Sequence, residues 1–305
     1  MSEDIRHIVS IAILQATPEL EISQGEYASL SRARTILSAA LAIEERYAIL
    51  IENYMALENA LLRISVANTV QNAREYEDFF VARLSLNTCI VNILTAVRLY
   101  LDQLPSSVGE CLDDEAALIQ RVKERCSKEY DDNVEYRFME ALRNHVQHRG
   151  IPIHLARQHA RWTGTGESRL MEFSVDIFAL RSEMEDDHKF KKSVLTEMSE
   201  RVDLKLATRS YLDSISAIHQ FARDIVAPFV TGAREAIENV HERYEEIYTE
   251  GLVGISAFTM TDGEATSSIP LLLDWDDVRV SLQNRNCKLN LRKSCVSGRP
   301  APNSP

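Results

Sequence analysis

Six consecutive residues near the middle of the chain, Arg143-Asn144-His145-Val146-Gln147-His148, include side chains that can cleave a phosphodiester without a metal. A histidine can take up or release a proton near neutral pH, because its ordinary pKa is about 6.5. An arginine presents a rigid fork of N–H donors that stabilises charge on phosphate oxygens. A neighbouring asparagine can orient the imidazole. Because RNA supplies its own nucleophile, the 2′-hydroxyl, these residue types suffice for RNA cleavage.

We expect these residues at the end of a helix over about 133–149. Its apolar stripe, which must face the core, consists of Phe138, Met139, Leu142 and Val146. At about 100° per residue, Asn144 and His148 are neighbours on the outward face, and Arg143 lies on the other flank of the stripe. The same outward face is expected to carry Glu140, Gln147 and Arg137. His145 fits a structural histidine at the edge of the core, and the alternative for His148 is a surface histidine without a role.

The local charge around this helix end favours phosphate binding. Between Arg137 and Trp162 there are five arginines and four histidines against one acid, Glu140, in a chain of formal net charge -12. Such a basic cluster can hold a phosphate backbone, although an idle solvated face has the same composition. The acidic chain as a whole argues against a broad nucleic-acid surface. The residues predicted to bind RNA are therefore local: Arg137, Gln147, Arg149, Arg157, His159 and Arg161.

The pattern Arg143-Asn144-x-x-x-His148 at a helix end resembles the motif of the HEPN superfamily, in which Arg, a polar residue, three further residues and His follow one another. The resemblance covers about 26–150. It implies a helical bundle, commonly a dimer with two motifs at the interface. Many members are ribonucleases of antiviral or toxin-antitoxin systems, and others are inactive binding modules. A hairpin after the motif is not a feature of the minimal family.

The resemblance thus implies a metal-independent endoribonuclease with Arg143, Asn144 and His148 as catalytic residues and no cofactor. The implied partners are RNA, a second copy of the chain and an antitoxin or other defence-system protein. The first alternative is a catalytically inactive HEPN-like module that binds RNA or a protein. The second is a metal-dependent hydrolase built on the clustered histidines, but no carboxylate or Cys joins them at ligand spacing.

Long helices are predicted on both sides of residue 105, because no Gly or Pro occurs from Glu26 to Leu104 or from Glu110 to Arg149. Polar segments at 68–75 and 127–133 break these stretches. The helices expected are therefore 26–68, 74–104, 113–127 and 133–149. Asp132 and Glu135 have the spacing of an N-cap and its box partner at the start of the last helix. An up-and-down bundle over 26–150 is the economical packing.

After Gly150 and Pro152 the pattern changes to alternation, which predicts a β-hairpin within 151–181. Its strands, 153–162 and 170–180, flank the turn-forming residues 163–166. Helical sequence returns from 191 to about 248 with a break near Pro228. The fold class is therefore mainly α, with an inserted hairpin and C-terminal helices over 190–260 that pack on the bundle.

The two ends of the chain carry weaker signals. Residues 1–25 form an N-terminal segment without a predicted element, and its acidic start is unlike a secretory signal. Residues 252–260 have the pattern of a short strand, residues 271–282 are ambiguous, and 284–305 reads as a flexible tail. The uncharged stretch 84–97 is too short to span a membrane. The five cysteines are an odd number without a Cys-x-x-Cys pair, which is typical of free thiols in a reducing compartment. Together these features predict a cytoplasmic protein that does not bind membranes.

Overall fold

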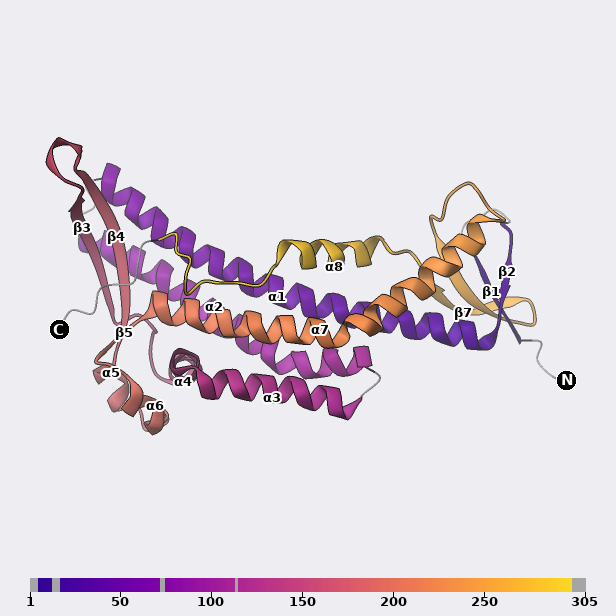
Figure 1. Ribbon diagram of the computed structural model, residues 1–305, viewed down its shortest axis with the longest axis horizontal. Helices are drawn as coiled ribbons and strands as arrows, with labels where there is room; N and C mark the ends of the chain where they lie inside the picture. The colour runs from indigo at the N-terminus through magenta and orange to yellow at the C-terminus, as the bar shows by residue number, and fades with distance from the viewer. Residues whose placement is uncertain (1–4, 13–16, 72–74, 113–114, 298–305) are drawn as a thin grey trace. The chain divides into compact units, whose positions relative to one another are not determined.

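The computed structural model describes residues 5–12, 17–71, 75–112 and 115–297. Within them the chain is mostly helical, with eight α-helices and two small antiparallel sheets (Figure 1). The predicted helix-rich class is therefore confirmed. The four-stranded sheet was not predicted, apart from a short strand at 252–260.

The four predicted N-terminal helices are present as α1 (Gln24–Val70), α2 (Tyr76–Leu112), α3 (Ala116–Asp132) and α4 (Val134–His148). A capping box starts α1, since Ser23 Oγ accepts from the backbone of Glu26 and the Glu26 carboxylate accepts from the backbone of Ser23. Two predicted ends were too early. α2 continues through Pro105, and α3 continues to Asp132, because the cap of α4 is the next residue, Asn133.

The predicted hairpin is confirmed as β3 (Leu155–Thr163) and β4 (Leu170–Leu180), paired from Leu155 opposite Phe178 to Thr163 opposite Leu170. A one-turn 3-10 helix, Gly166–Ser168, lies in the connecting loop, where Gly164 and Gly166 adopt φ of 84° and 64°. A third strand, β5 (Arg201–Asp203), extends the sheet on the other edge of β4. Three residues are too few to show an alternating pattern, so the sequence carried no signal for it.

The second half of the chain differs from the prediction at two places. The short helices α5 (Ser182–Glu185) and α6 (Lys192–Glu197) precede β5, and only then does α7 (Leu204–Glu245) begin. The predicted break near Pro228 is wrong, because α7 continues through this residue. The apolar neighbours Ile225, Val226 and Val230 are buried, so their packing offsets the roughly 3 kcal/mol that proline costs inside a helix.

A four-stranded sheet joins strands from residues 5–22 with strands from residues 255–270. Its order is β2-β1-β6-β7, from β1 (Ile5–Ile11), β2 (Leu20–Ile22), β6 (Ile255–Thr261) and β7 (Glu264–Pro270). β6 confirms the short strand predicted at 252–260. The turn after it is Asp262-Gly263, with φ of 52° and 88°, as a tight hairpin requires. The ambiguous stretch that follows is the helix α8 (Asp274–Arg285).

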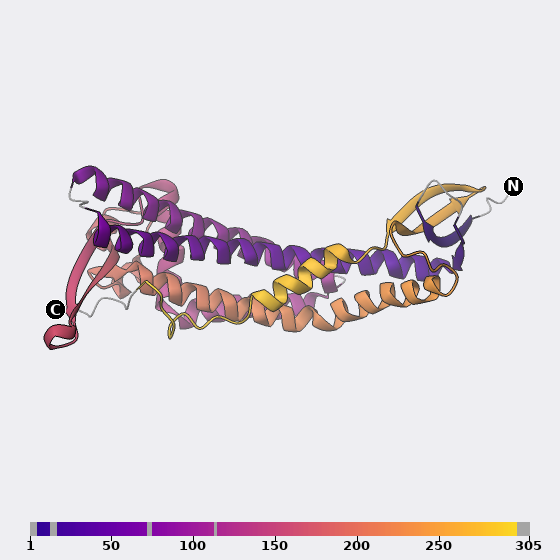
Figure 2. The same cartoon turned by 90° about the horizontal axis from the view of Figure 1, so that it is seen from above.

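The chain divides into two compact units that do not follow the predicted sequential domains. The first consists of residues 1–45, 103–121 and 222–287, and the second of 46–102, 122–221 and 288–305. The long helices α1, α2 and α7 contribute residues to both. In the first unit, the start of α1 lies beside the four-stranded sheet in both views (Figures 1 and 2). Arg243 of α7 forms an ion pair with Glu26 of α1 there.

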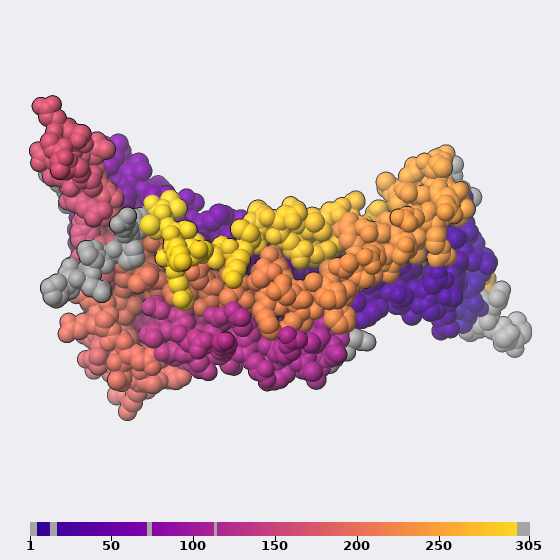
Figure 3. Space-filling view, viewed as in Figure 1, coloured from indigo at the N-terminus to yellow at the C-terminus, as the bar shows by residue number. Residues whose placement is uncertain are grey.

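The segment after α8 packs against α7 rather than forming the predicted flexible tail (Figure 3). The backbone N–H of Leu289 donates to Ser216, and those of Leu291 and Arg292 donate to Asp213, over 2.7 to 3.0 Å. Further on, Ser297 accepts a hydrogen bond from the buried Arg209. The prediction therefore fails up to residue 297, and residues 298–305 lie outside the described residues.

One described helix, α2, is long and apolar enough by composition to cross a membrane. In its most apolar window 39% of the residues are buried inside the protein, and a helix from the core of a soluble protein passes the same test. A single helix of this kind is weak evidence for a membrane span.

Candidate functional site

The helix α4 is anchored at its start by Asn133. The side-chain oxygen of Asn133 accepts from the backbone N–H of Tyr136 at 3.2 Å, and its amide nitrogen donates to Ser214 of α7 at 2.9 Å. Tyr136, Phe138, Met139, Ala141 and Leu142 are buried, as is His145. One N-cap thus satisfies a helix-end donor and attaches α4 to α7, which determines the face that α4 leaves open.

Three of the predicted outward residues at the end of α4, Asn144, Gln147 and His148, are exposed. Asn144 lies one helical turn before His148. No residue in the described part of the chain forms a hydrogen bond with the His148 imidazole. Both ring nitrogens are therefore without a hydrogen-bond partner among the described residues, and the predicted exposure of Asn144, Gln147 and His148 is confirmed.

Arg143 is half-buried, and Asn144 determines where its guanidinium points. The Nη1 of Arg143 donates to the side-chain oxygen of Asn144 over 2.9 Å. The Nε of Arg143 is buried and has no hydrogen-bond partner within the described ranges. Arg143 and His148 are five positions apart on the helix, and Asn144, the hydrogen-bond partner of the guanidinium, lies on the face that carries His148.

Glu140 and Arg137 do not share this open face, contrary to the prediction. The hydroxyl of Tyr211, in α7, donates a hydrogen bond to the Glu140 carboxylate. Burial, and then the charge of Glu140, raise the pKa of Tyr211 well above its usual range. Arg137 donates to Glu197 at 2.8 and 3.1 Å and to the backbone carbonyl of Tyr130. Both side chains therefore connect α4 to neighbouring elements.

His145 is buried, as predicted for a histidine at the edge of the core. Its Nδ1 forms a hydrogen bond of 2.8 Å with Asp187, which follows α5. That hydrogen bond lowers the pKa of the Asp187 carboxyl below its ordinary value. Arg149 lies 3.6 Å from the other oxygen of Asp187. Sequence reasoning missed this partner because the pair Asp186-Asp187 has the composition of an ordinary loop.

The basic cluster is partly neutralised by acids from distant positions. The register of the hairpin places Glu172 opposite Arg161, and the two form an ion pair of 2.7 Å. His159 lies 3.0 Å from Asp176, which also accepts from the buried Lys205 at 2.6 Å. Of the residues predicted to bind RNA, the exposed Gln147 and Arg157 have no hydrogen-bond or ion-pair partner within the described ranges. Cross-strand pairing therefore removes part of the local positive charge.

The clustered histidines do not form a metal centre in the described part of the chain, where no three His, Cys, Asp or Glu side chains come together. The rings of His145 and His154 are 6.2 Å apart, but each is held by a partner of its own. His145 bonds to Asp187, and His154 accepts from the backbone N–H of Leu180. Burial lowers the pKa of His154, which favours its neutral form.

Comparisons of the chain with protein-family models, with curated proteins and with solved structures find no match.

Proposed function

We propose that Arg143, Asn144 and His148 form the site of a metal-independent endoribonuclease of HEPN type. One observation carries the proposal: Asn144 holds the Arg143 guanidinium at 2.9 Å, one turn before an imidazole that is exposed and open to a substrate. Arg143, which can donate hydrogen bonds to a phosphate, and His148, which can transfer a proton, therefore lie at the same helix end. The motif resemblance supports this reading from the sequence.

In this scheme the 2′-oxygen attacks the adjacent phosphorus and the bond to the 5′-oxygen breaks. His148 accepts the proton of the 2′-hydroxyl or supplies one to the leaving 5′-oxygen. Arg143 stabilises the charge that gathers on the equatorial oxygens. The products are a 2′,3′-cyclic phosphate and a 5′-hydroxyl. A single imidazole cannot perform both proton transfers at once, so a homodimer with two copies of α4 at its interface would supply the second.

The exposed residues near this helix end offer a short track for the RNA backbone. Gln147 lies between Asn144 and His148 on α4, and Arg149 is the first residue after the helix. Arg157 projects from β3 without an acidic partner in the described part of the chain. Arg161 and His159 can bind a phosphate only by giving up their present carboxylate partners, Glu172 and Asp176. Arg137 is held by Glu197 and has a smaller role.

The decisive experiment compares His148→Ala with His188→Ala in cleavage of a synthetic RNA. His188 is also exposed and has no hydrogen-bond partner within the described ranges, so it is a matched control. We expect His148→Ala to lower the cleavage rate about 100- to 10,000-fold, the usual contribution of a general acid or base. The His188→Ala variant should cleave at the wild-type rate, and both should unfold like the wild type.

The chemistry of the products provides a second criterion. RNA with a 2′-deoxy substitution at the cleaved position should resist, and a chelator should have no effect. Products with 3′-hydroxyl and 5′-phosphate ends, or activity that requires a divalent metal, would contradict the proposal.

A catalytically inactive HEPN-like module that binds RNA or a protein is the second candidate. The ion pairs of Arg161 and Arg149 favour it, because they leave less positive charge for a substrate. This module would bind its partner equally well with and without the His148 imidazole. In either case we place the protein in the cytoplasm, in a defence or toxin-antitoxin setting.

A further inference from the structure

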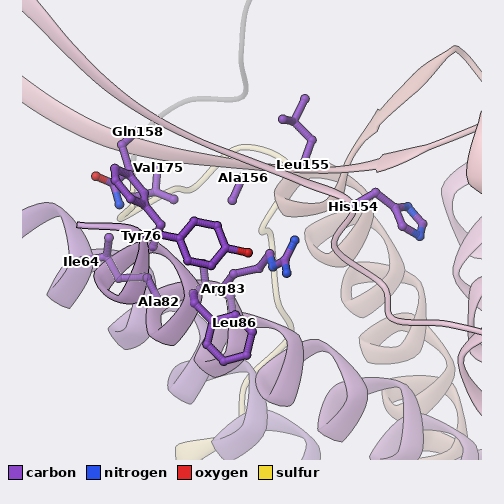
Figure 4. A pocket seen from close by; sticks show the side chains of 12 residues that line it. Ile64, Tyr76, Ala82, Arg83, Leu86, His154, Leu155, Ala156, Gln158 and Val175 are labelled. Atoms are coloured by element: carbon purple, nitrogen blue, oxygen red, sulfur yellow. The ribbon is translucent and has the colours of Figure 1, made fainter. Parts of the chain in front are cut away.

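The second unit contains a pocket that is separate from the residues of the candidate nuclease site. It lies between the start of α2 and the hairpin, with a volume of about 300 Å³ (Figure 4). That volume is at the lower end of the range for ligand pockets, 300 to 1,000 Å³.

Most of the wall is apolar. Nine of the twelve lining residues are aliphatic or aromatic, including Ile64 of α1, Leu86 of α2 and Val175 of β4. Phe79 and Phe80 also line the pocket, and each leaves 46% of its surface exposed. Large aromatic side chains that are half exposed around a hollow favour an apolar ligand, because the ligand removes their surface from water.

Among the described residues of the lining, Arg83 supplies the only formal positive charge. In Figure 4 its side chain extends from α2 and ends beside the hydroxyl of Tyr76. No described residue forms a hydrogen bond or an ion pair with its guanidinium. The described lining contains no Asp or Glu, and burial lowers the pKa of His154 at the margin, which disfavours a second positive charge. An arginine against an apolar wall favours an anionic partner, and a carboxylate matches its donor fork.

From this combination we propose that the pocket binds a small amphiphilic monoanion, whose apolar body contacts Phe79 and Phe80 and whose carboxylate pairs with Arg83. A medium-chain fatty acid has this chemistry and a suitable size. A nucleotide fits less well, because apart from Arg83 the described lining offers few polar groups that could recognise the edge of a base, namely Gln158, the Tyr76 hydroxyl and the His154 ring. The inference does not depend on ribonuclease activity.

Calorimetric titration of the full-length protein with decanoate, decylamine and AMP tests the proposal. The chain has a net charge of -12, so unspecific attraction favours the amine. We expect decanoate to bind one site per chain, at least tenfold more tightly than decylamine or AMP. Equal binding of decanoate and decylamine would overturn the proposal. Binding of AMP in place of decanoate, or of phosphatidylglycerol vesicles without binding of free decanoate, would do the same.

Two variants locate the site. Arg83→Met should weaken decanoate binding at least tenfold, whereas the matched control Arg63→Met should leave it within twofold. Arg63 is exposed on α1 beside Ile64 but does not line the pocket. Phe80→Ala removes part of the apolar wall from a side chain that is already half exposed, so it should fold and bind decanoate more weakly. Unchanged decanoate affinity in Arg83→Met would refute the assignment. If Arg83→Met does not fold, unchanged affinity in Phe80→Ala would refute it.

Discussion

Arg143 depends on its neighbours for its position. The side chain is half-buried, and its guanidinium donates one hydrogen bond to Asn144 at 2.9 Å. Its positive charge also acts to lower the pKa of Tyr211, although burial and Glu140 raise that pKa more strongly. One nitrogen of the guanidinium, Nη1, is thus held by the protein, and Nη2 is available to a ligand. This is the arrangement expected of a donor that recognises a phosphate by geometry as well as by charge.

We therefore expect Arg143→Lys to be nearly as damaging as Arg143→Ala. Lysine keeps the positive charge but loses the planar fork that bonds Asn144 and a phosphate oxygen together. Loss of one such donor typically costs about 100- to 1,000-fold in rate. Single-turnover cleavage of RNA by the two variants is the measurement. A lysine variant within twofold of the wild type would mean that Arg143 acts through charge alone.

The end of α4 is shaped by a contact between a glycine and a fixed histidine. A Cβ at Gly150 would lie 2.8 Å from Nε2 of His145, which is closer than such atoms approach in proteins. His145 cannot move aside easily, because its other nitrogen is bonded to the buried Asp187. Only glycine therefore allows the chain to turn away from the helix at this point and lead into the hairpin.

Replacing Gly150 by Ala should accordingly destabilise the protein by about 1 to 3 kcal/mol, the usual cost of overpacking. Gly232 is the matched control, because it lies inside α7 and a Cβ there meets nothing within 4 Å. Gly232→Ala should stabilise by about 0.4 to 1 kcal/mol, since alanine restricts the unfolded chain. Urea unfolding measures both. Shifts of the same sign would refute the steric explanation.

At the level of the whole chain, the second unit is assembled from segments that are far apart in the sequence. Glu58 of α1 accepts two hydrogen bonds from Arg209 of α7, and Arg209 donates a further one to Ser297. These three residues are buried. A charged pair in such surroundings depends on every polar neighbour, because an unsatisfied buried group is costly.

A chain ended at Cys287 should consequently be less stable than the full chain. It lacks the donors of Leu289, Leu291 and Arg292 and the Ser297 acceptor, each worth about 1 kcal/mol or more. The loss should amount to several kcal/mol in urea unfolding. Asp213→Asn, which weakens only two of these bonds, should lie between the full and the shortened chain. Equal stability of the full and shortened chains would show that the segment contributes nothing.

The local features of this protein could be predicted from its sequence. The open face of α4, the buried His145 and the hairpin after Gly150 follow from apolar residues that recur every 3.6 or every 2 positions. Such a pattern involves only residues close together in the sequence. The capping residue was displaced by one position, and the break at Pro228 was wrong, because burial of the surrounding apolar residues outweighs the local preference against proline.

Features that join distant segments could not be predicted in this way. β1 pairs with β6 across some 250 residues, Asp187 meets His145, and Glu172 and Asp176 neutralise part of the basic cluster that the sequence presents. The segment after α8 packs on α7 for the same kind of reason. Such contacts arise from burial and strand register, which depend on the whole folded chain and leave no periodic signal in either partner. Residue types and spacing thus identified the candidate site, whereas tertiary packing determined which of its charges remain available.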